Sequence, residues 1–306
     1  MPISNFPNGF ANGVNIRGIP LLSAYPGNVF WVHSGTGSDG NRGTFDRPFA
    51  TIDGAISSSA VTASRGDIIM VKAGHAETTT SAITMDVAGV AIIGLGVGRS
   101  RPAITGTFGS AGDTVTVTAA NCAMSNIRLV ASGASQNAQV NIAAADFTMS
   151  NCVIEQGSSN LIGVTVASGG HRFCFSNCMW LGTANGPDVA IDFESSASDD
   201  YVIEDCLFNF GQNGCDLGVI RANADTVEGG LIRRCAMIGV DTVAIDFNSS
   251  AGATGDGLVS DCRFVASAAL TSIEDIIDVG GYNFAECYAV DAVSASAARV
   301  PLSTVS

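Results

Sequence analysis

The sequence is poor in positive charge. Its 14 Lys and Arg residues stand against 28 Asp and Glu residues, so the formal net charge is −14, and Lys72 is the only lysine. Proteins that bind nucleic acid neutralise phosphates with clustered Lys and Arg, and anionic membrane surfaces attract the same residues. The composition therefore predicts a protein that binds neither nucleic acid nor a membrane.

The sequence also predicts neither a secretory signal nor a membrane-spanning segment. The opening MPISNFP (1–7) has neither basic residues nor an uninterrupted apolar run, both of which a secretory signal needs. No run approaches the roughly 18 consecutive apolar residues of a membrane span. We therefore expect a protein that is made and folds in a cytoplasm.

Motifs for catalysis or ligand binding are scarce. His33, His75 and His171 share no spacing typical of a metal site, and no Ser-His-Asp or Cys-His arrangement can be traced. The run GLGVG (94–98) follows an expected strand, but RSRP (99–102) stands where a dinucleotide-binding helix would begin. The sequence predicts no cofactor and no metal.

The cysteines, by contrast, follow a regular repeat. Six of the nine stand in a hexad of the form apolar-x-x-Cys-x-apolar, and one earlier copy has Ile127 in the cysteine position. The copies are MSNIRL (124–129), MSNCVI (149–154), FSNCMW (175–180), IEDCLF (203–208), IRRCAM (232–237), VSDCRF (259–264) and FAECYA (284–289). A spacing of 25 to 29 residues indicates a repeat architecture.

Between the hexads lies a second strand-like run with alternating apolar residues. Its copies are VTV (115–117), VNI (140–142), VTV (164–166), AIDF (190–193), VIRA (219–222), AIDF (244–247) and IIDV (276–279). Two short strands with glycine-rich bends leave no room for a helix in each repeat. The chain is therefore predicted to be all-β: a right-handed parallel β-helix, or β-solenoid, whose turns stack ~4.8 Å apart.

Within each turn, the third residue of the hexad is expected at a bend, where Asn and Asp tolerate a left-handed backbone. The cysteine that follows would point inward, which makes a structural column of Cys152, Cys178, Cys206, Cys235, Cys262 and Cys287. Stacked Cα atoms lie within disulfide range, but parallel Cβ vectors oppose the bond. We expect buried, reduced thiols, and we assign no role to Cys122, Cys174 and Cys215.

The rest of the chain divides around these turns. Residues 1–28 have no period and read as an extended arm, and residues 29–65 as a strand, a loop and a short capping helix. That helix would place Ile52, Ala55, Ile56 and Ala60 on one face, covering the open first turn. Residues 66–290 form the coils, and residues 291–306 a tail.

Three segments at the start of the coils point to a family. GTFDRPFATIDGAI (43–56), GDIIMVKAG (66–74) and GVAIIGLG (89–96) resemble the opening of the pectate-lyase-like β-helix superfamily, and MPISNFPNGFANGVNIRGIPL (1–21) resembles the start of β-helix proteins of tailed bacteriophages. The resemblance implies a virion protein that decorates the capsid or forms a head fibre. It would dock on capsid or other virion proteins through Phe6, Phe10, Ile16, Arg17, Ile19 and Leu21, and a homo-oligomer, provisionally a trimer, is expected.

The superfamily also contains enzymes that cleave polysaccharides with clustered carboxylates. The candidate residues here are Asp192, Arg221, Asp246 and Asp278, one on each successive outward-facing strand position. Arg221 would stand between Asp192 and Asp246 and lower their pKa values, which favours a solvent-facing column of structural charges. We therefore expect a non-enzymatic virion protein; the alternative is a tail-spike-like protein that binds or depolymerises a host polysaccharide.

Overall fold

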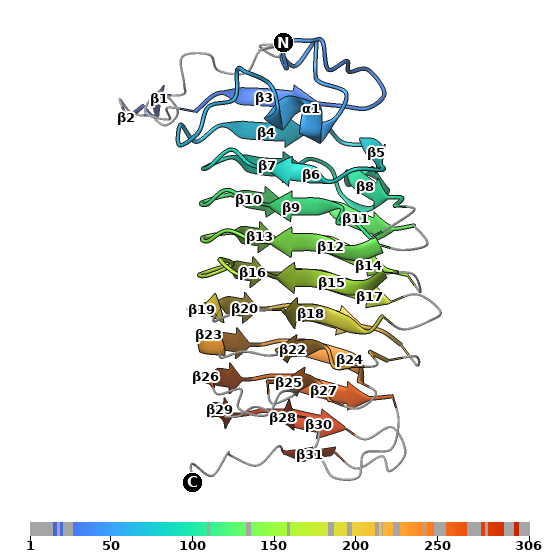
Figure 1. The fold of residues 1–306 in the computed structure, drawn as a ribbon, viewed down its shortest axis with the longest axis vertical. Coiled ribbons are helices and arrows are strands. Elements are labelled where there is room, and N and C mark those ends of the chain that lie inside the picture. The colour runs from blue at the N-terminus through green and yellow to red at the C-terminus, as the bar shows by residue number, and fades with distance from the viewer. Residues whose placement is uncertain are drawn as a thin grey trace.

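The computed structural model of the chain describes residues 15–16, 19–20, 27–108, 111–132, 136–157, 160–182, 187–194, 198–211, 214–215, 217–222, 227–240, 243–247, 255–267, 277–278, 281–290 and 297–299. Nearly all of the described elements are β-strands that wind into stacked turns (Figure 1). The prediction of a right-handed parallel β-helix is confirmed.

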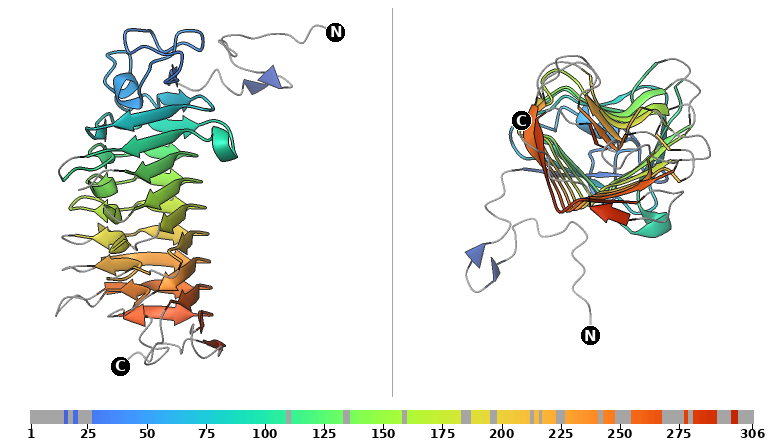
Figure 2. Two further views of the ribbon diagram at one scale, coloured as in Figure 1. Left: turned by 90° about the vertical axis from the view of Figure 1, so that its right-hand side faces the viewer. Right: turned by 90° about the horizontal axis from the view of Figure 1, so that it is seen from below.

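Three parallel sheets surround one apolar core (Figure 2, right). Sheet B contains β3 Val29–Val32, β4 Ile68–Val71, β7 Ala91–Gly94, β10 Ala123–Ser125, β13 Thr148–Ser150, β16 Cys174–Ser176, β20 Val202–Glu204, β23 Val227–Arg233, β26 Gly255–Ser260 and β29 Tyr282–Ala285, with β19 Ser198–Asp199 beside β23. Sheet C contains β5 Ala76–Thr79, β8 Ala103–Gly106, β11 Arg128–Ala131, β14 Val153–Gln156, β17 Met179–Gly182, β21 Leu207–Asn209, β24 Ala236–Val240, β27 Arg263–Ala266, β30 Tyr288–Val290 and β31 Ala297–Arg299. Sheet D contains β6 Ile83–Met85, β9 Val115–Val117, β12 Gln136–Ile142, β15 Asn160–Val166, β18 Val189–Phe193, β22 Ile220–Ala222, β25 Ile245–Asp246 and β28 Ile277–Asp278.

A full turn therefore has three strands, one more than the sequence pattern suggested. Each hexad holds two of them, because it spans the end of a sheet B strand, a bend and the start of a sheet C strand. The alternating run that follows is the sheet D strand, as its spacing predicted. The sequence pattern did not separate the two hexad strands, because only two residues, the bend residue and the one after it, lie between them.

That interrupting residue has a left-handed backbone in every copy of the hexad. The seven residues have φ between 52° and 57°: Asn126, Asn151, Asn177, Asp205, Arg234, Asp261 and Glu286. Side chains also stack from turn to turn at the bend, where Asn151 Nδ2 donates to Asn126 Oδ1 at 3.1 Å and Arg234 binds both Asp205 oxygens at 2.7 Å. The predicted bend is confirmed. Four charged residues have this left-handed backbone, in addition to the three asparagines.

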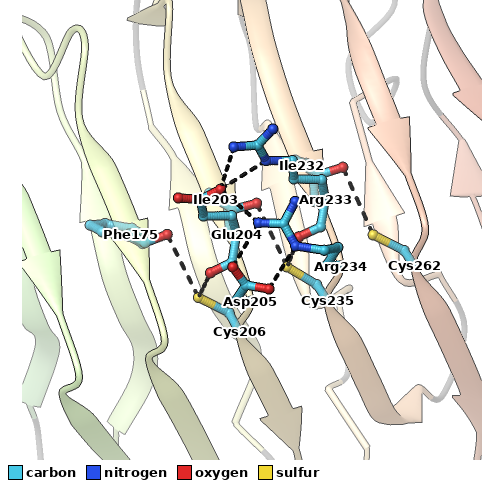
Figure 3. A network of polar contacts seen from close by, with 10 residues as sticks. All are labelled: Phe175, Ile203, Glu204, Asp205, Cys206, Ile232, Arg233, Arg234, Cys235 and Cys262. Carbon is cyan, nitrogen blue, oxygen red and sulfur yellow. Dashed lines mark hydrogen bonds and ion pairs between the residues drawn. The ribbon is translucent and has the colours of Figure 1, made fainter.

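Immediately after the bend, the six hexad cysteines point into the core, each at most 3% exposed, below the equally buried Ile127. Each sulfur lies near the carbonyl two residues before it and near a carbonyl of the preceding turn; Cys178 Sγ, for example, is 3.4 Å from the Ser176 oxygen and 3.5 Å from that of Met149. Figure 3 shows Cys206, Cys235 and Cys262 in line beside the Glu204, Asp205, Arg233 and Arg234 ion pairs. All six are free thiols in the structure.

The first turn is covered by the short helix α1 Ile52–Ile56. Thr51 begins it, because its Oγ1 accepts the Gly54 N–H at 3.0 Å, and the helix contacts β3, β4 and β6. Ile52, Ala55 and Ile56 are buried as expected. Ala60 is exposed, so its predicted place on the same face is wrong: the helix ends four residues earlier.

The predicted arm and tail are described only in part. Ile16 and Ile19 pair across β1 Asn15–Ile16 and β2 Ile19–Pro20, which form the antiparallel sheet A. The other docking candidates, Phe6, Phe10, Arg17 and Leu21, lie outside the described residues. In the segment expected to be a tail, β31 pairs antiparallel with β30 and so adds a last strand to sheet C.

We predict that a thiol reagent labels almost none of the six column cysteines in the native protein and all of them after denaturation. All six side chains are at most 3% exposed, so the reagent cannot reach them. Hydrogen bonds to the thiols of Cys152 and Cys206, together with burial, raise the pKa of Cys178 well above its ordinary value, whereas the same contacts lower the pKa values of Cys152 and Cys206, so protection depends on burial. Mass spectrometry of labelled peptides measures this. A disulfide-linked peptide pair such as Cys178–Cys206 would contradict it.

Candidate functional site on the outer face of sheet D

The outward positions of sheet D are occupied by a continuous row of polar residues. Strand pairing places them directly above one another, in the order Thr84, Thr116, Asn141, Thr165, Asp192, Arg221, Asp246 and Asp278. Their neighbours on each strand point into the core, because residues along a strand alternate between the two faces. We call this row the sheet D ladder. The predicted candidates Asp192, Arg221, Asp246 and Asp278 all belong to it.

Asp192 and Arg221 form a two-pronged ion pair in the middle of the ladder. Arg221 Nε donates to Asp192 Oδ1 and Arg221 Nη2 donates to Asp192 Oδ2, both at 3.0 Å. The Asp192 side chain is 2% exposed and that of Arg221 is 14% exposed. The expectation of a solvent-facing column is therefore wrong at Asp192, which is buried although it lies on the outer face of its sheet.

Glu194 lies two residues beyond Asp192 and on the same side of the chain. It is exposed. Partial desolvation raises the pKa of its carboxyl, and the negative charges of Asp192 and Asp113 raise it further, while Arg221 opposes them. Glu194 is thus the ladder-side carboxyl whose protonated form the surroundings favour.

Asp113 reaches the same region from the segment before β9. Its Oδ2 accepts from Asn141 Nδ2 at 2.9 Å and its Oδ1 accepts from the Ala138 N–H at 3.2 Å. These bonds orient the Asn141 amide, whose Oδ1 is buried and has no hydrogen-bond partner within the described part of the chain. A hydroxyl group is one donor that would satisfy such an oxygen.

The arrangement places carboxyls in different surroundings, which general acid–base chemistry requires. Asp192 is held by Arg221, Asp113 accepts two hydrogen bonds, and Glu194 is favoured as an acid. Asp246 lies in register with Arg221 one turn further on, and Asp278 in register with Asp246. The structure therefore brings all four sequence candidates into one row and pairs two of them.

Sequence reasoning missed Glu194 and Asp113. A signal for Glu194 was present, since VAIDFESS (189–196) and VAIDFNSS (243–250) differ at that position alone. Asp113 precedes its partner Asn141 by 28 residues, slightly more than one turn, and this distance in sequence hides the contact. No group of three or more His, Cys, Asp or Glu residues is placed to hold a metal ion in the described ranges, and no described helix is long and apolar enough to cross a membrane.

Solved structures share this fold. The chain resembles a pectin methylesterase mutant in complex with a hexasaccharide, at a TM-score of 0.52 and 11% identity over 85% of this chain and 89% of that one. It also matches the native lacto-N-biosidase of family GH136 from Eubacterium ramulus (TM-score 0.45, 11% identity, 86% and 68% covered) and ORF18 of Geobacillus virus E2 (0.29, 12%, 76% and 56%). Neither a family model nor a curated protein matches the chain.

These findings support the parallel β-helix fold and correct one expectation. The prediction of a protein without enzymatic activity is contradicted, because a similar structure is that of a pectin methylesterase. At 11% identity the likeness to the methylesterase shows the fold alone. The expectation depended on Arg221 lying between Asp192 and Asp246, and Glu194 was not among the candidates.

We predict that Arg221→Met lowers the free energy of unfolding by about 3–5 kcal/mol, because it leaves the buried Asp192 carboxylate without a partner. Adding Asp192→Asn should recover part of this loss. The control, Arg128→Met, removes the partner of Glu155 from a more exposed pair and should cost about 1 kcal/mol or less. Urea unfolding measures all three; equal losses for Arg221→Met and Arg128→Met would contradict the burial of the Asp192 pair.

Proposed function

We propose that this protein binds a glycan along the outer face of sheet D and hydrolyses it there. The observation that carries the proposal is Glu194: an exposed carboxyl with a raised pKa beside the Asp192–Arg221 pair and Asp113. A general acid must carry a proton and be reachable by substrate. Glu194 is exposed, and its surroundings raise its pKa, which favours the protonated form. The fold adds support, since parallel β-helices present long flat surfaces that suit an extended chain.

In the proposed reaction Glu194 donates its proton to the oxygen of the glycosidic bond. The bond between that oxygen and the anomeric carbon breaks, and the oxygen of a water molecule bonds to the carbon. Asp113, oriented by Asn141 and the Ala138 N–H, accepts the proton that the water loses. Asp192 stays paired with Arg221 and acts as a positioning residue, because its charge favours the protonated form of Glu194.

The resemblance of residues 1–21 to the start of phage β-helix proteins supports a location for this activity. We propose that the arm, residues 1–28, attaches the protein to capsid or other virion proteins and that the coils meet a host polysaccharide. Such a protein would be made in the host cytoplasm and carried on the virion. Attachment and glycan hydrolysis are separate functions of separate segments, so each can be removed alone.

We predict that Glu194→Gln abolishes release of reducing ends from a glycan panel while preserving binding and fold. Glu228→Gln, an exposed glutamate on β23 of sheet B, is the matched control and should keep full activity. Wild-type activity should fall as the pH rises through the raised pKa of Glu194, because the proton to be donated is lost there. Undiminished activity in Glu194→Gln would overturn the assignment, and absence of both binding and release across the panel would overturn the function.

We predict that deletion of residues 1–28 abolishes binding to the parent particle but leaves the coils folded and active. The coils carry their own core, and each turn is held by its neighbours. Sedimentation with particles measures attachment, and thermal unfolding measures the fold. An arm-deleted protein that still binds particles, or one that aggregates, would contradict the prediction.

A further inference from the structure

Carboxyl groups outnumber cations at the candidate site on sheet D. Arg221 is the only Lys or Arg residue on the described strands of that sheet. Five carboxyls belong to the sheet D ladder or interact with its members: those of Asp113, Asp192, Glu194, Asp246 and Asp278. The charge of the site is therefore negative when these groups are ionised.

The one cation already has a partner inside the protein. Arg221 donates to Asp192 from both Nε and Nη2, at 3.0 Å each, and Asp246 lies in register on its other side. The Asp192 side chain is 2% exposed, so a substrate carboxylate that took Arg221 from it would leave a buried charge without a partner. An acidic sugar therefore gains little by binding Arg221.

The other arginines of the same turns do not change this balance. Between β10 and β24 each of the remaining described arginines pairs with a carboxyl of an adjacent turn: Arg128 with Glu155, Arg172 with Asp146, Arg233 with Glu204 and Arg234 with Asp205. None of these pairs lies on a strand of sheet D. Their positive charges are compensated where they stand, and the sheet D ladder keeps its excess of carboxyls.

The turns before Asp192 offer uncharged polar groups instead. The ladder positions there are occupied by Thr84, Thr116, Asn141 and Thr165. The Asn141 amide is oriented by Asp113, and its Oδ1 is buried without a hydrogen-bond partner within the described residues. Such an oxygen accepts from a hydroxyl or an N–H, whereas an ionised carboxylate has only acceptors to offer. This half of the ladder therefore also favours an uncharged sugar.

Glu194 argues against a positively charged sugar as well. Partial desolvation raises the pKa of its carboxyl, and the negative charges of Asp192 and Asp113 raise it further. A cationic amino sugar bound beside Glu194 would lower this pKa and favour the ionised form, which has no proton to donate. A neutral sugar leaves the surroundings of Glu194 as they are.

We propose that the sheet D site takes a neutral glycan and rejects glycans that carry carboxylate, sulfate or phosphate groups. This inference rests on the proposed function, because it names the class of substrate for the same site. Sugar hydroxyls donate to Asn141 Oδ1 and to the carboxyls, and these bonds hold the glycan. The carboxyls also repel an acidic sugar, so the same residues that bind one class of glycan exclude the other.

The test compares two forms of one glycan that differ in charge alone. The probes are the neutral glycan with primary hydroxyls that binds best in a panel, and the same glycan after oxidation of those hydroxyls to carboxylates. Both are titrated by calorimetry into full-length Glu194→Gln, which should bind without cleaving. The oxidised form should bind about tenfold more weakly, or worse, at low ionic strength. The difference should shrink at about 0.5 M salt, because salt screens the repulsion.

A matched pair of variants locates the repulsion. Asp246→Asn, added to Glu194→Gln, should reduce the preference for the neutral form by about threefold, because it removes one negative charge from the ladder. Glu228→Gln, added to the same background, removes one negative charge from sheet B and should leave the preference unchanged. Equal effects of the two substitutions would show that the net charge of the protein decides, and would overturn the proposal.

Two further results would overturn the neutral-substrate inference. The oxidised glycan could bind as well as the neutral one, or a uronate, sulfated or phosphorylated glycan could bind most tightly in the panel. If wild type cleaves such an acidic glycan and Glu194→Gln does not, the proposed function stands and only the class of substrate is wrong. If glycans of neither kind bind, the proposed function fails, and this inference fails with it.

Discussion

The left-handed residue at the bend between sheets B and C determines the alignment of the whole molecule. A single residue with φ near 55° turns the chain from one sheet to the next, and it recurs in seven successive turns. Because the bend is one residue long, there is no slack in which the register could slip. Side chains at and beside the bend therefore lie above their counterparts in the preceding turn, and similar residues form rows along the molecule; the register shifts only farther from the bend, between Val227 and Gly230 and between Ile238 and Val240.

The inward rows build the core, and the outward row of sheet D carries the polar residues of the candidate site. The inward row after the bend is made of thiols, which fill the core as small apolar groups. The outward row of sheet D collects Asn141, Asp192 and Arg221, which in sequence are 51 and 29 residues apart. Beside this row, desolvation and the negative charges of Asp192 and Asp113 raise the pKa of Glu194.

The sequence predicted the features that recur in every turn, and it did not predict the features that occur in one turn only. The cysteine spacing, the bend residues and the alternating strand are periodic, so their positions followed from counting. The burial of Asp192 and the positions of Glu194 and Asp113 beside it each occur in one turn only. They depend on contacts between particular turns, which a repeat pattern does not reveal. The same holds in the core, where the hydroxyls of Tyr201 and Tyr282 meet at 2.8 Å across 81 residues. Gly230 leaves room for this contact, because a Cβ there would lie 2.4 Å from both rings' ends.

The central claim is that the sheet D ladder is where a glycan binds. The most direct measurement is a crystal structure of Glu194→Gln soaked with an oligosaccharide that the wild-type protein cleaves. The account predicts sugar density along the outer face of sheet D, with a glycosidic oxygen within hydrogen-bond distance of the residue at position 194 and a hydroxyl at Asn141 Oδ1. Density over sheet B or sheet C, with sheet D empty, would contradict it.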